Sequence, residues 1–341
     1  MTLVAGFSLG GLPAFVGDLL LSSLLPTSVD LPTRPQPARL PGLDRHFAAS
    51  LGQKLVILRP WFMIAWAGSH SNANRIIKGI DAILPRASDE PAKDVSVFEL
   101  LNSCDEDSEL IALIIRDDGV HPLLARTRGF ELDGKRIYLM GSGKTHAFQY
   151  LEARPEVLPG QENSDGLLAR AIALRFGARA MATQWLTGSG LQESWGGGFE
   201  FAFPDQDRVF RKVDKVLFRG WIINGGGSFA NVGRSFFSRY YGQDLYLSCF
   251  NPEEKTFIVP SIIGEPAKIP EYEVCSPTWT IDTFFHLPTG CLFETARFTP
   301  RDEPTADLVE LVNGQLGGWR MDRAYVAGLV EAANGIAGRD T

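Results

Sequence analysis

The sequence lacks the residue patterns that bind metals or nucleic acids. Its 341 residues include only four cysteines and five histidines. The cysteines form no C-x-x-C pair and the histidines form neither H-x-x-x-H nor H-E-x-x-H, so a metal site has no support. The net charge of −7 and the pI of about 5.4 argue against a nucleic-acid surface. We therefore expect no metal, no other cofactor and no nucleic-acid partner.

Long apolar runs are also missing. The segment from Leu19 to Leu25 is too short to cross a bilayer. The first residues lack the basic region of a signal peptide, and Pro13 and Asp18 interrupt their apolar run. The cysteine usage is typical of a reduced intracellular protein. The sequence accordingly predicts a cytoplasmic protein with no membrane partner.

What the sequence does contain is an unusual first stretch. Two apolar runs, Leu3–Phe7 and Leu12–Val16, flank Gly10-Gly11, which predicts a β-hairpin. If Met1 is removed, Thr2 carries both a hydroxyl and a free α-amine. The pKa of such an amine is about 7.7–8, so part of it is unprotonated near neutral pH. A nucleophile with its base on the same residue is a compact catalytic unit.

The same stretch supports a rival interpretation. Gly6-Phe7-Ser8-Leu9-Gly10 matches G-x-S-x-G, the nucleophile elbow of α/β-hydrolases, which would make Ser8 the nucleophile of an esterase. Its position argues against this, because no earlier strand precedes Ser8 to supply the oxyanion loop. An ordinary hairpin that happens to contain a serine is a third interpretation.

Downstream, the sequence predicts a mixture of strands and helices. Five prolines between Pro26 and Pro41 exclude a helix or a central strand there. Nearly continuous apolar strands are expected at Lys54–Leu58 and Trp61–Ala67, followed by a helix that Pro85 ends. Further strands are predicted at Glu109–Ile115, His121–Ala125, Arg136–Met140, Phe199–Phe203, Val213–Phe218, Leu245–Phe250, Thr256–Val259 and Cys291–Phe298. Further helices are predicted at about Asp165–Leu186, Pro304–Leu316 and Arg323–Ile336.

Three stretches together resemble the N-terminal-nucleophile (Ntn) hydrolases, most closely the branch of the proteasome β-subunit and bacterial HslV. Thr2 and Asp18 stand sixteen residues apart, as in that family. Lys54-Leu55-Val56, followed by Ala67-Gly68-Ser69 and a helix, is similar to the family's lysine strand and Ala-Gly-Ser turn. Gly141-Ser142-Gly143 after an apolar strand resembles its Gly-Ser-Gly turn. The resemblance extends over roughly residues 2–200.

The resemblance implies an α+β fold, a four-layer αββα sandwich with an additional β-rich and helical C-terminal extension. On this basis we expect an Ntn-hydrolase-like domain over residues 1–218, with a Pro-rich insertion over residues 26–43. Residues 219–341 would form the C-terminal extension, to which the sequence assigns no role. Members of the family commonly assemble into rings or dimers, so a homo-oligomer is expected.

The resemblance also implies a role for each matching residue. Thr2 would be the nucleophile, with its own amine as base. The positive charge of Lys54 would lower the pKa of that amine, and Asp18 would hold Lys54 charged and oriented. The Gly68 backbone N–H would donate to the oxyanion, and Ser142 would hydrogen-bond near the Thr2 amine. The substrate would be a peptide or a small amide.

Some features depart from the family pattern. The family usually places an Asp after the second long helix, whereas Thr187 to Ser194 contains none. A chain that keeps Met1 would also have a blocked nucleophile. These departures favour a second hypothesis, a catalytically silent proteasome-like module for assembly or binding.

Overall fold

The computed structural model describes residues 2–9, 12–23, 25, 29–33, 47–85, 94–132, 135–152, 165–187, 195–205, 207–224, 230–250, 254–264, 267–300 and 306–337. The chain is mostly β, with 49% in strands and 25% in helices. Most of the predicted Pro-rich insertion, residues 26–43, lies outside the described residues. Within the described part, no helix combines the length and the apolarity needed to cross a lipid bilayer.

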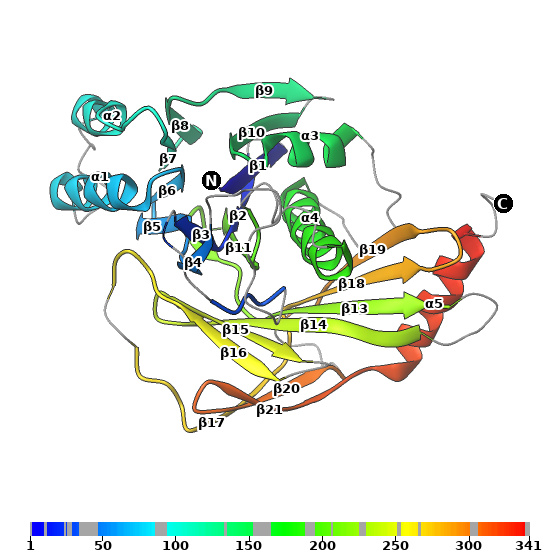
Figure 1. Ribbon diagram of the computed structural model, residues 1–341. Coiled ribbons are helices and arrows are strands. Elements are labelled where there is room, and N and C mark those ends of the chain that lie inside the picture. The colour runs from blue at the N-terminus through cyan, green and yellow to red at the C-terminus, as the bar shows by residue number, and fades with distance from the viewer. Residues whose placement is uncertain are drawn as a thin grey trace.

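The predicted N-terminal hairpin is confirmed, and it lies in the middle of a six-stranded antiparallel sheet, the β1 sheet (Figure 1). In spatial order its strands are β12 (Phe210–Lys212), β11 (Phe199–Pro204), β2 (Leu12–Asp18), β1 (Leu3–Leu9), β10 (Lys135–Gly141) and β9 (Gly129–Leu132). Leu3 pairs with Gly141, and Val4 pairs with Gly17. Thr2 therefore lies at the end of the sheet where β2 and β10 terminate.

A four-stranded antiparallel sheet, the β6 sheet, packs against one face of the β1 sheet. Its strands are β5 (Leu55–Arg59), β6 (Phe62–Ala67), β7 (Glu109–Arg116) and β8 (Gly119–Ala125). Buried side chains such as Val4, Phe15 and Met63 fill the space between the two sheets. The other face of the β6 sheet packs on α1 (His70–Ile83) and α2 (Asp94–Asn102). A separate pair of strands consists of β3 (Leu20–Ser23) and β4 (Phe47–Leu51).

The later part of the chain forms a second six-stranded sheet, the β14 sheet. Its strands, in order, are β16 (Lys255–Val259), β15 (Asp244–Phe250), β14 (Ala230–Tyr241), β13 (Val216–Ile223), β18 (Trp279–His286) and β19 (Cys291–Phe298). The β13–β18 pair is parallel, and the other pairs are antiparallel. Beyond it lie a three-stranded sheet, the β20 sheet, and a helix: β17 (Tyr272–Cys275), β20 (Leu308–Val312), β21 (Gln315–Arg320) and α5 (Arg323–Ala337).

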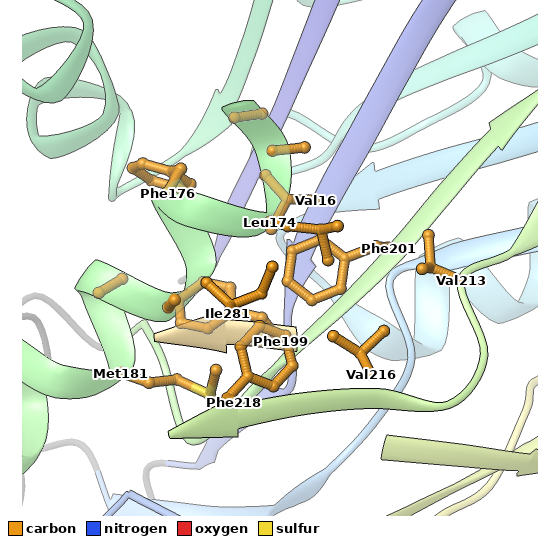
Figure 2. Packing of buried hydrophobic residues seen from close by; sticks show 14 of the residues in the cluster. Val16, Leu174, Phe176, Met181, Phe199, Phe201, Val213, Val216, Phe218 and Ile281 are labelled. Atoms are coloured by element: carbon orange, nitrogen blue, oxygen red, sulfur yellow. The ribbon is translucent and has the colours of Figure 1, made fainter. Parts of the chain in front are cut away.

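The expectation of a four-layer αββα sandwich is wrong, because the helical layer on the β1 sheet is internal. That layer contains α3 (Lys144–Glu152) and α4 (Asp165–Thr187). Helix α4 lies between the β1 sheet and the β14 sheet (Figure 1). Leu174 and Met181 of α4 share one core with Val16 and Phe199 of the first sheet and Phe218 of the second (Figure 2).

The composition of α4 explains this arrangement. Its buried residues include five alanines, Ala169, Ala171, Ala173, Ala178 and Ala180. They lie on two opposite faces of the helix rather than on a single stripe, as expected for a helix that packs between two sheets. Small side chains also let both sheets approach the helix axis closely. The two sheets therefore share one core, and the predicted domain division at residue 218 falls inside β13.

Candidate active site around Thr2

Thr2 is completely buried at the start of β1. Its backbone N–H donates to Ser142 Oγ at 3.3 Å, and its carbonyl oxygen accepts the Gly143 N–H at 3.3 Å. A side chain at Gly141 (φ +82°) would place its Cβ 2.0 Å from that carbonyl oxygen, so the turn can follow Thr2 this closely only with glycine. Thr2 Oγ1 is buried and has no hydrogen-bond partner among the described residues. Such an unused buried hydroxyl is rare and needs an explanation.

Asp18, at the end of β2, joins three parts of the site. Its Oδ1 accepts the Leu3 N–H at 3.0 Å, and its Oδ2 accepts the Gly196 N–H at 2.8 Å. The carboxylate thus fixes the start of β1 next to the segment that follows α4. Burial raises the pKa of Asp18 to about 6, although the charge of Lys54 and the two backbone hydrogen bonds oppose this shift.

Lys54 is fully buried immediately before β5. Its ammonium donates to the Leu20 carbonyl oxygen at 3.0 Å and lies 4.5 Å from the centroid of the Trp66 ring. Burial lowers the pKa of Lys54 to about 8, while the charges of Asp18 and Glu200 act in the opposite direction. The site therefore holds a buried cation whose pKa lies near the physiological range.

The close approach of Lys54 to β2 depends on Gly17. A Cβ at Gly17 would lie 3.0 Å from the Lys54 Cβ, which is tighter than almost all real contacts. Gly17 is also the partner of Val4 in β1, two residues after Thr2. The structure therefore brings Thr2, Asp18, Lys54 and Ser142 to one end of the β1 sheet.

Glu200 is a member of this site that the sequence analysis missed. Its Oε1 accepts the Leu55 N–H at 2.8 Å and also the Lys54 N–H, while its Oε2 bonds the ammonium of Lys212. It faces Gly17 across the β2–β11 pair. It thereby attaches the backbone of Lys54 to β11. The available signal was a single acid within the aromatic segment Phe199–Phe203.

Gly68 lies at the turn between β6 and α1. Its φ is +99°, and a Cβ there would lie 1.9 Å from the Asp107 carbonyl oxygen, so this position requires glycine. The next residue, Ser69, begins α1 by accepting the Asn72 N–H at 3.3 Å. This local geometry holds the Gly68 turn at the mouth of a pocket.

A pocket of about 1030 Å³ opens in front of this cluster, and both Gly68 and Ser142 line it. Thr2 lies directly behind Ser142, which is its hydrogen-bond partner. On the rim, Glu109 accepts the Gly141 N–H at 2.6 Å and pairs with Lys144. The sequence analysis also missed this ion pair. The pocket has the size of a small-molecule or peptide site.

The carboxylate that the family has after the second long helix lacks a counterpart in the sequence, and residues 188–194 lie outside the described part. A different support follows them. The Gly196 N–H binds Asp18, while the Gln184 side chain donates to the Trp195 carbonyl at 3.1 Å and accepts the Gly197 N–H at 3.2 Å. The backbone around Gly196, which the Gln184 side chain holds in place, thus binds Asp18 of the site.

The other candidates differ from Thr2 in their surroundings. Ser8 lies within β1, opposite Pro13 and Arg136, and not at a turn from strand to helix. The structural context that the nucleophile elbow requires is therefore absent at Ser8. Among the described residues, no three of His, Cys, Asp and Glu lie together as metal ligands.

A comparison with models of known protein families found no match, and a search of curated proteins found no similar sequence.

Proposed function

We propose that the chain is an amide-bond hydrolase of the N-terminal-nucleophile type, with Thr2 as the nucleophile after Met1 has been removed. One observation carries this proposal. Thr2 Oγ1 is a buried hydroxyl without a hydrogen-bond partner among the described residues, the buried Asp18 binds the N–H of the next residue, and Ser142, which binds the Thr2 N–H, lines a large pocket. Perturbed pKa values next to a cleft are typical of functional sites.

In this mechanism the Thr2 amine takes the proton of Oγ1, and Oγ1 forms a bond to the substrate carbonyl carbon. The carbonyl oxygen becomes an oxyanion, for which the Gly68 N–H is the proposed donor. Collapse of this intermediate breaks the C–N bond, and the leaving amine departs with the proton. Water then hydrolyses the ester on Thr2 and restores the hydroxyl.

Two neighbours support this role for the amine. Ser142 Oγ already lies 3.3 Å from the Thr2 nitrogen. The buried ammonium of Lys54 would lower the pKa of a free amine nearby and so favour its basic form. The substrate of this proposal is a peptide or a small amide, and a homo-oligomer remains the expected assembly.

A silent binding module is the second candidate, and the complete burial of Thr2 favours it, because Thr2 itself does not line the pocket. Intact-mass measurement of the purified chain separates the two candidates. Loss of the mass of Met1 is expected for the enzyme, and full retention of Met1 in all molecules favours the module.

The decisive variant is Thr2→Ala, assayed on fluorogenic amides. We expect kcat to fall by at least about 10³-fold, since removal of a nucleophile leaves only residual catalysis. Thr33→Ala is a matched control, because Thr33 is also fully buried and its Oγ1 also lacks a partner among the described residues. Equal activity of the two variants would overturn the proposal.

A further inference from the structure

A second pocket, of about 540 Å³, adjoins the first. Leu21 of β3 and His70 of α1 line both pockets, so the two pockets border on each other at these side chains. Gly68 is only two residues before His70. If a substrate carbonyl lies at the Gly68 N–H, the substrate groups next to that carbonyl can therefore reach the second pocket.

The second pocket is formed by distant parts of the chain. One side comes from β3, β4 and the start of α1, and the other comes from Phe257, Ile258 and residues 260–262 in and after β16. Ile258 is 52% exposed and presents a large apolar side chain to this space. The β14 sheet thus provides one wall of a pocket that borders the candidate active site.

The polar groups of this pocket differ in what they bind. The Gln53 amide donates to the Val259 carbonyl at 2.9 Å, and Asp30 pairs with Lys255. Asn74 Oδ1, by contrast, is buried without a hydrogen-bond partner among the described residues. Because this atom has no exposed surface, a ligand in the pocket does not reach it. The side chains that a ligand can meet there include the apolar Phe257, Ile258 and Ile262.

His70 adds no charge to this apolar space near pH 7. Burial lowers its pKa, and the charge of Lys54 lowers it further. No other titratable side chain lines both pockets. An apolar group can therefore pass His70 without meeting an imidazolium.

We infer that the second pocket selects the substrate, and that β16 with residues 260–262 forms its specificity wall. The occupant is the acyl part of an amide that carries an apolar group. This inference rests on the proposed function, and it assigns to the later half of the chain a direct role in substrate choice.

The first test uses coumarin amides of N-acetyltryptophan and of N-acetylglutamate. The tryptophan amide is expected to give the higher kcat/KM. Ile258→Glu should lower that value about tenfold or more, mainly through KM, because it puts a charge in an apolar pocket. Val274→Glu is the matched control, since Val274 is a similarly exposed strand residue (47%) that does not line the pocket. Equal effects of the two variants would overturn the inference.

Direct binding separates failure of the inference from failure of the proposed function. If no amide is hydrolysed, the proposed function fails, and titration of N-acetyltryptophan into the Thr2→Ala protein by calorimetry still tests the pocket. Binding that the added Ile258→Glu change weakens about tenfold, and that Val274→Glu leaves unchanged, supports the specificity wall. Absent binding, or equal binding by both double variants, overturns it.

Discussion

Two buried clusters of charge lie in different halves of the molecule. The Arg219 cluster, in the β14 sheet and the segments beside it, consists of Arg219, Asp282, Asp307 and Arg297. Arg219 makes a bidentate pair with Asp282 at 2.7 and 2.8 Å and a third bond to Asp307 at 2.8 Å. Burial alone would lower the pKa of Arg219, but the two carboxylates raise it above its usual value. Each charge in this cluster meets an opposite charge directly.

The Lys54 cluster, which consists of Lys54 and Asp18, is built differently. The Lys54 ammonium donates to a backbone carbonyl, and the Asp18 carboxylate accepts two backbone N–H groups. Both pKa values move towards neutrality, to about 8 for Lys54 and about 6 for Asp18, because burial is the largest effect on each. These charges act on each other through the protein interior.

The difference indicates what each cluster is for. A buried charge with a full set of ionic partners is held in one protonation state. Its removal leaves the partner charges buried without a counter-charge, which carries a large desolvation penalty. A buried charge without such partners changes protonation easily, which suits chemistry near neutral pH. The first cluster is therefore interpreted as structural, and the second as functional.

The strongest test of this contrast is Arg219→Met. It leaves Asp282 and Asp307 buried with their main partner removed, so the free energy of unfolding should fall by about 3–5 kcal/mol. Denaturant titration measures this change. Arg211→Met is the matched control, because the Arg211 side chain is 60% exposed and, among the described residues, makes its ion pair with Asp205, and it should lose at most about 1 kcal/mol. Similar losses in the two variants would contradict the structural role.

Lys54→Met should lower the activity strongly and the stability only moderately, in contrast to Arg219→Met. Activity is expected to fall by about 10²–10³-fold, as for loss of one preorganised electrostatic group, while stability falls less than in Arg219→Met. Without the cation the pKa of the Thr2 amine rises, so the acidic limb of the kcat/KM profile should move to higher pH. Lys215→Met, which removes a cation near Glu273 in the other half, is the control. An unmoved acidic limb would refute the role of Lys54.

The sequence could predict the elements that local rules determine. The hairpin before Asp18, the apolar strands around Trp66 and the long helix α4 follow from turn residues and periodicity. The separation of Thr2 and Asp18 also pointed to residues that the structure places together. These are features in which neighbouring residues carry the whole signal.

The errors come from partners that are distant in the chain. The helix predicted over residues 304–316 is wrong from residue 308 onward, since residues 308–320 form the hairpin of β20 and β21 around Asn313-Gly314, where φ is +49° and +74°. That pair is a strong signal for a type I′ turn. Strand β18 was missed because its buried Asp282 breaks the apolar pattern, and only Arg219, far away in the chain, makes that carboxylate tolerable. The packing of the β14 sheet on α4 likewise could not be predicted from neighbouring residues, because the sheet and the helix are far apart in the chain.

The smallest expected effect concerns Asp18 and pH. The pKa of Asp18 rises from 3.8 to about 6 on folding, so between these pH values the folded chain binds more protons than the unfolded chain. The stabilisation is fully present below pH 3.8 and is lost as the pH rises through about 6. Between pH 7 and pH 5 the wild type should therefore gain about 1 kcal/mol relative to Asp18→Asn, measured by denaturant titration at both pH values. A constant difference would mean that Asp18 does not titrate in this range, and the contrast with the Arg219 cluster would then be lost.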